Sequence, residues 1–103
     1  MFADDAWLSG FIDGGGCFTH CSGVRRKDGT RKLYPRFRIG DDRSLLHALQ
    51  QEFGGSVSLH KPEAYVWVAT GDSLKLLIAY LERYPLRAQK AHQFAEWRRR
   101  FSL

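Results

Sequence analysis

The sequence predicts an α+β fold whose helices and strands follow in the order α-β-β-α-β-β-α-α. Three observations support this prediction. Apolar residues recur at helical spacing in four stretches, first at Leu8, Phe11 and Ile12. Residues 31–40 alternate with a period of two, as a strand buried on one face does. Turn residues at 27–30 and around 61–64 predict that the strands pair as two antiparallel hairpins.

The first helix is expected to begin at a cap formed by Asp4 or Asp5 and to run to about Asp13. Gly10 lies inside this helix, where glycine costs about 1 kcal/mol relative to alanine. Close approach of a second helix would explain the glycine. The alternative is that Gly10 is a weak point and that the glycines at 14–16 only end the helix.

The first hairpin should join a strand over residues 16–25 to a strand over 31–40. On the second strand, the face suited to the core carries Leu33, Pro35, Phe37 and Ile39. The opposite face is basic and aromatic, with Lys32, Tyr34, Arg36 and Arg38. Pro35 has no N–H donor, which predicts a sheet edge or a bulge at that point.

The second hairpin is predicted from strands over 56–60 and 65–70. In the last strand we expect Val66 and Val68 in the core, with Tyr65 and Trp67 exposed on a ligand surface. The alternative exchanges the two faces and buries the aromatic residues.

Three further helices are predicted by the same criteria. Asp41 or Asp42 should cap the second, and Gly54 should end it. Pro85 should end the third, because proline cannot continue a helix. The three helices are expected over about 42–53, 72–84 and 87–101, and the arginine run at 98–100 is expected to be solvated.

The 103 residues predict a single domain over 1–103, and the net charge of +5 suggests a nucleic-acid partner. No apolar run is long enough to span a bilayer and no signal segment is apparent, so we expect an intracellular protein, in cytoplasm or organelle matrix, without a membrane partner. Cys17 and Cys21 are expected to be free thiols. A zinc site including His20 would lack a second ligand pair.

Residues 8–16 read Leu-Ser-Gly-Phe-Ile-Asp-Gly-Gly-Gly and resemble the LAGLIDADG motif of homing endonucleases. The pair Cys17-Phe18 resembles the start of the strand that follows the motif. At the position of the family's metal-binding Asp or Glu, this chain has Gly15. The predicted element order extends the resemblance to nearly the whole chain, and it implies a four-stranded antiparallel saddle sheet.

The motif occurs once, and single-motif members of this family act as homodimers. The resemblance therefore implies two copies of the chain, packed through Trp7, Ser9, Gly10, Asp13 and Gly14. It also implies a long, pseudo-palindromic double-stranded DNA site read in the major groove. The DNA-binding residues it implies are Thr19, Cys21, Arg25, Lys32, Tyr34, Arg36, Arg38, Ser58, His60, Tyr65 and Trp67.

In the family, Mg²⁺ or another divalent cation at the helix ends supports hydrolysis of both DNA strands. The resemblance places the backbone carbonyl of Gly14 at the metal, with the catalytic positions at Asp13, Gly15, Asp41, Gln89 and Lys90. Arg87 is an alternative to Lys90, which is otherwise an ordinary exposed helix lysine; Asp41 is otherwise an N-cap. Without an acid at position 15, metal binding and cleavage should be weak or absent.

Two other classes of protein fit the sequence. One is a non-cleaving nucleic-acid-binding protein, either a DNA binder or an RNA maturase that assists intron splicing. The other is a small basic α+β domain that oligomerises and binds nucleic acid without selectivity. Metal-dependent cleavage and ligand preference distinguish these classes.

Overall fold

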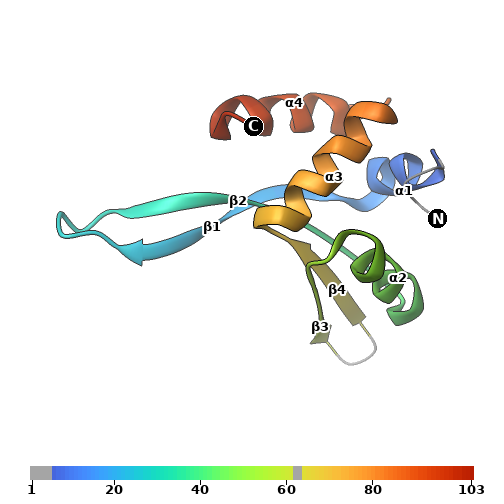
Figure 1. Ribbon diagram of the computed structural model, residues 1–103, viewed down its shortest axis with the longest axis horizontal. Helices are drawn as coiled ribbons and strands as arrows, with labels where there is room; N and C mark the ends of the chain where they lie inside the picture. Colours follow the sequence, from blue (N-terminus) through green and yellow to red (C-terminus); the bar gives the residue numbers. More distant parts are fainter. Residues whose placement is uncertain (1–5, 62–63) are drawn as a thin grey trace.

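The computed structural model describes residues 6–61 and 64–103, and it shows the predicted order of helices and strands (Figure 1). The elements are α1 (Trp7–Gly15), β1 (Cys17–Arg25), β2 (Arg31–Asp41), α2 (Arg43–Phe53), β3 (Ser56–Lys61), β4 (Ala64–Ala69), α3 (Gly71–Arg83) and α4 (Gln89–Phe101). Asp4 and Asp5, the predicted caps of the first helix, lie outside the described residues. No described helix is long and apolar enough to cross a membrane.

The strands form one antiparallel sheet in the order β1-β2-β4-β3. The β1–β2 hairpin projects well beyond the helices as a two-stranded ribbon (Figure 1), and the molecule measures 45 × 32 × 22 Å. Pairing of β2 with β4 begins at Phe37, so Pro35 lies where β2 has no neighbour on that side. The predicted sheet edge at Pro35 is therefore local: β2 is an inner strand of the sheet, but it tolerates proline where one of its edges is free.

One hydrophobic core joins the inward faces of β2 and β4 to all four helices. Phe37 and Trp67 are its largest fully buried side chains, and their ring centroids lie 5.9 Å apart. Phe18 of β1 packs between Phe37 and Trp97, at 5.1 Å from each centroid. The indole N–H of Trp97 also donates to the carbonyl of Thr19 at 2.7 Å, which holds α4 against the ribbon.

The predicted exposure of Trp67 is wrong, and the alternative that buries it is confirmed, whereas Val66 is buried as predicted. Trp67 pairs with Ile39 and therefore shares the inward face of the sheet. Its side chain is fully buried, and its indole N–H donates to the carbonyl of Gly54 at 2.8 Å. Tyr65 is half-buried against the same core. Burying the larger apolar area stabilises the fold more, and Trp67 finds a partner for its one polar group.

The helix caps follow the prediction in part. Asp42, rather than Asp41, caps α2, and its carboxylate accepts from the amide of Leu45 at 3.0 Å. Thr70 caps α3 in a reciprocal arrangement with Ser73, and the helix begins at Gly71, one or two residues before the predicted start. In both helices a side chain satisfies backbone donors that the helix itself leaves unpaired.

Candidate nucleic-acid interface and helix-end site

The basic face of the ribbon is built by the pairing register of β1 and β2. Arg36 lies opposite Thr19, and Tyr34 lies opposite Cys21. Directly paired residues of an antiparallel sheet point to the same side, so these side chains share one face. It is the face opposite the buried Phe37 and Ile39, as the alternation in β2 predicts.

This outward face carries cations and no acid. Neither β1 nor the stretch 31–40 of β2 contains Asp or Glu. Lys32 is exposed, whereas Arg36 and Arg38 are half-buried, lying close along the sheet surface. Nε of Arg36 is buried without a hydrogen-bond partner in the described part of the chain. Arg25 lies beyond an irregularity in the pairing, opposite Arg31 near the hairpin tip.

The second hairpin extends this face with small and apolar residues. Ser58 lies opposite Val66, and Val66 in turn lies opposite Gly40 of β2, so they continue the outward face. Val68, opposite Arg38, belongs to the same face. His60 lies in β3, but its side chain is outside the described part. Val66 and Val68 thus lie on the outward face, where Tyr65 and Trp67 were predicted. Tyr65 and Trp67 instead lie on the face that packs against the core.

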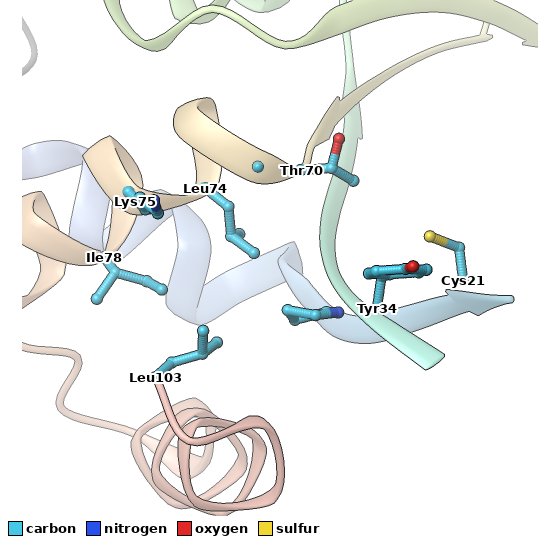
Figure 2. A pocket seen from close by; sticks show the side chains of 9 residues that line it. Cys21, Tyr34, Thr70, Leu74, Lys75, Ile78 and Leu103 are labelled. Atoms are coloured by element: carbon cyan, nitrogen blue, oxygen red, sulfur yellow. The ribbon is translucent and has the colours of Figure 1, made fainter. Parts of the chain in front are cut away.

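A pocket of about 410 Å³ adjoins this face at the free edge of β2 (Figure 2). Tyr34 and Thr70 line it, together with Leu74 and Ile78 of α3. Leu103, the last residue of the sequence, closes the side opposite Thr70 in this view (Figure 2). The pocket therefore joins the ribbon to the N-terminal half of α3.

The end of α1 presents open glycines. A Cβ atom added to Gly14 or Gly15 would meet no described atom within 4 Å, and neither residue has a positive φ. Gly16 differs, because its Cβ would lie 2.8 Å from Ile12 and from Phe37. Close packing against the core therefore requires glycine at position 16 but not at position 15.

Asp13 joins α1 to the beginning of α4. Its carboxylate accepts from the amide of Arg87 at 3.0 Å and from the amide of Ala88 at 3.3 Å. Ala88 is the N-cap of α4 and has no side chain able to cap it, so Asp13 supplies the cap from another helix. Both carboxylate oxygens are thereby engaged inside the subunit, while Asp13 remains half-buried and lines a surface pocket with Trp7 and Gly10, so its place at the subunit interface stays a prediction.

Ser9 is also engaged inside the subunit. It is buried, and its hydroxyl donates to the carbonyl of Tyr84. This hydrogen bond holds Ser9 against the end of α3, and Ser9 also lines a surface pocket with Trp7 and Gly10, so its place at the dimer interface stays a prediction. The exposed side of α1 consists of Trp7, Gly10 and Gly14, with Phe11 half-buried beside them.

Of the remaining predicted catalytic residues, Gln89 and Lys90 lie beside these helix ends, whereas Asp41 lies at the end of β2 opposite Tyr65. Gln89 and Lys90 form the first turn of α4, which Asp13 ties to the end of α1. The ammonium group of Lys90 donates to the side chain of Gln93 at 3.2 Å. Asp41 ends β2, and its carboxylate accepts from the amide of Asp42 at 2.7 Å.

The residues present do not fit a carboxylate-held divalent cation. Gly15 has no side-chain oxygen, and the oxygens of Asp13 already accept backbone hydrogen bonds. Within residues 6–61 and 64–103, no three His, Cys, Asp or Glu side chains gather where one metal ion could be held. Mg²⁺ prefers carboxylate oxygens and loses its waters reluctantly.

The four-stranded antiparallel sheet, the glycine-rich first helix and the basic outward face are the features that the resemblance to the LAGLIDADG motif implies. The profile of the LAGLIDADG endonuclease family matches residues 8–101, and the chain belongs to this family. It is similar to the probable intron-encoded endonuclease 4 of Neurospora crassa, with 35% identity over 99 residues. The match covers 91% of this chain and 18% of that protein, so the chain spans less than a fifth of this curated relative.

Solved structures show the same fold. The crystal structure of the homing endonuclease I-TnaI is 32% identical, with a TM-score of 0.80 over 94% of this chain and 69% of that one. The LAGLIDADG meganuclease I-AabMI, bound to uncleaved DNA, is 28% identical, with a TM-score of 0.79 over 96% of this chain and 36% of that one. The predicted α+β fold of the homing endonuclease type is confirmed.

Proposed function

We propose that two copies of this chain bind a long, pseudo-palindromic double-stranded DNA site through their β1–β2 ribbons. The observation that carries the proposal is the outward face of the ribbon, where Lys32, Arg36 and Arg38 alternate along one strand and no acid intervenes. A two-stranded ribbon fits the major groove, and arginine is the commonest reader of guanine there. The DNA-bound relative I-AabMI supports the choice of ligand.

The proposed dimer rests on the glycines of α1. Gly10 and Gly14 are exposed, and no described atom of their own subunit requires the absence of a side chain at either position. Each costs the helix about 1 kcal/mol relative to alanine. Close approach of the α1 helix of a second copy supplies the missing reason, because small residues let two backbones come together. The ribbons would then extend to opposite sides of a two-fold axis, which predicts the pseudo-palindromic site.

We further propose that this chain binds its site without efficient cleavage. The acid-bearing form of such a helix end would hold a divalent cation that activates water and stabilises the leaving oxygen. Here Gly15 offers no carboxylate, and Asp13 is committed to α4. Lys90 and Gln89 remain at the helix end, so the surroundings of the site are retained while the acid is missing.

Selection from a randomised duplex library tests the proposal, with the retained duplexes sequenced and then incubated with Mg²⁺ or with chelator. We expect a two-fold-related consensus and intact strands under both conditions. Selection of no consensus would support the third class, a basic domain without sequence preference. Tighter binding to structured RNA than to any selected duplex would favour the maturase alternative.

A further inference from the structure

The ribbon contains a β-bulge near its tip. Ser22 pairs with Leu33, and the next pair is Arg25 with Arg31. Two residues of β1, Gly23 and Val24, therefore lie opposite Lys32 alone. A bulge of this kind increases the local twist and redirects neighbouring side chains.

Gly23 leaves space that the ring of Tyr34 fills. A Cβ atom added to Gly23 would overlap Cε2 of this ring, and it would lie 3.3 Å from the carbonyl oxygen of Lys32. The absence of a side chain at Gly23 therefore lets the ring lie directly on the backbone of β1. Tyr34 lies beside the pocket at α3 and remains 44% exposed, so the ring rests on the backbone of β1 and is still accessible to a ligand.

Lys32 confines the same ring from another side. Its ammonium nitrogen lies 5.2 Å from the centroid of the Tyr34 ring, within the range of a cation–π contact. Tyr34 thus has a set position before any ligand binds. Pre-organised side chains lose less conformational entropy on binding, and a tyrosine presents both a ring and a hydroxyl at low entropic cost.

We infer that Gly23 is a positioning residue, which holds Tyr34 as a base-reading side chain in the outer part of each DNA half-site. This inference rests on the proposed function. Tyr34 pairs with Cys21, whereas Arg38 pairs with Cys17 directly after α1, so Tyr34 lies farther from the dimer centre. Four strand residues span about 13 Å. With the ribbon lying along the groove, this corresponds to about four base pairs at roughly 3.4 Å each.

The test measures base preference at every position of the selected site for Gly23→Ala, Tyr34→Ala, Arg38→Ala and the unaltered chain. Val24→Ala is the matched control, because Val24 belongs to the same bulge and is 89% exposed. Gly23→Ala should displace mainly the exposed ring, which is the far end of a flexible side chain, and should shift the carbonyl of Lys32 by only a few tenths of an ångström. Thermal unfolding and overall affinity for unrelated duplex should therefore stay close to those of the unaltered chain.

Gly23→Ala and Tyr34→Ala should reduce discrimination about tenfold at the same base pair or pairs. These pairs should lie about four positions outward from those that Arg38→Ala affects, and Val24→Ala should change none. Full discrimination by Gly23→Ala at the pair that Tyr34→Ala affects would overturn the inference. So would unchanged preferences in Tyr34→Ala, a result independent of how Gly23→Ala folds. An unaltered chain that selects no sequence would instead overturn the proposed function.

Discussion

Gly15 and Asp13 are two residues apart on α1, yet their surroundings differ completely. Gly15 has open space in the direction a side chain would take. Asp13 is held by two backbone amides at the beginning of α4. The structural role of Asp13 and the missing acid at position 15 are therefore separate matters. The Cβ atom of an acidic residue introduced at position 15 would meet no described atom within 4 Å, whereas the carboxylate of Asp13 already accepts hydrogen bonds from the backbone amides of Arg87 and Ala88.

Introducing an acid at position 15 should restore cleavage. Gly15→Asp and Gly15→Glu should fold as the unaltered chain does, because the position has helical backbone and no described neighbour within 4 Å. Each variant adds one carboxylate per subunit at the helix end, the ligand type that Mg²⁺ prefers. Incubation with the selected duplex should then give Mg²⁺-dependent cuts in both strands.

The control for this experiment is Gly15→Asn, which adds a similar volume without the charge and should bind DNA without cutting it. Strong cleavage by the unaltered chain would show that another residue serves as the acid. Tight binding without cleavage by either acid variant would favour the non-cleaving alternative.

Trp67 should contribute strongly to stability, in contrast to the expectation that it contacts DNA. Its side chain is fully buried and packs against Phe37 and Phe53. Trp67→Ala should lower the free energy of unfolding by about 3–5 kcal/mol. Urea unfolding measures this loss, and Tyr34→Ala, at an exposed aromatic residue, should change stability by only about 0.5 kcal/mol or less. A near-neutral Trp67→Ala would contradict the buried face of β4.

At the scale of elements, the ribbon presents the basic face, and α1 presents the exposed glycines. The ribbon projects its basic face beyond the helices (Figure 1), and Trp97 of α4 fixes its inner end through Thr19. α1 packs Leu8 and Ile12 into the core and leaves its glycines exposed. One helix thus has a packed side, set by its apolar residues, and an open side available to a second copy.

The central part of the ribbon should provide DNA affinity and specificity. Replacing both Arg36 and Arg38 by alanine removes two cations from the outward face of β2. A base-reading arginine should cost about 1–3 kcal/mol and relax preference at one position, whereas a phosphate contact should weaken all duplexes alike and flatten the salt dependence. Fluorescence anisotropy at several salt concentrations separates the two effects.

Replacing both Arg99 and Arg100 of α4 by alanine is the matched control. This variant also loses two positive charges, but from exposed positions of a helix. It should change the affinity far less than the ribbon variant does. Equal affinity of the Arg36/Arg38 variant and the unaltered chain at moderate salt would show that the ribbon does not contact DNA.

At the scale of the whole molecule, the single motif and the open face of α1 predict assembly. A leucine at Gly10 should separate the two α1 helices and shift the chain toward monomer, since backbones cannot approach across a large side chain. Ala79→Leu adds a similar apolar side chain to an exposed position of α3 and should leave the assembly unchanged. Sedimentation velocity at micromolar concentration measures both. A monomeric unaltered chain would contradict the proposed dimer.

The local sequence pattern alone predicted the buried and outward faces of β2 and the family of the chain. The alternation along β2 sets polar against apolar residues, so it correctly predicted that Phe37 and Ile39 are buried. It also predicted the outward face that carries Arg36 and Arg38. The motif letters in α1 identified the family, and one letter, Gly15, showed that the acid is absent. Each of these conclusions needs only residues within about ten positions of one another in the sequence, because strand alternation and the motif are both local patterns.

Only the tertiary structure showed which face of the last strand is buried and which distant groups Asp13 and Ser9 contact. Residues 65–68 read Tyr-Val-Trp-Val, apolar on both faces, so only the register with Ile39 showed which side is buried. Asp13 and Ser9 find their partners 74 to 75 residues away, at a distance no short motif spans. The support of Tyr34 by Gly23 depends on a bulge across two strands. In each case the deciding energy comes from contacts between distant segments, which form only when the chain folds.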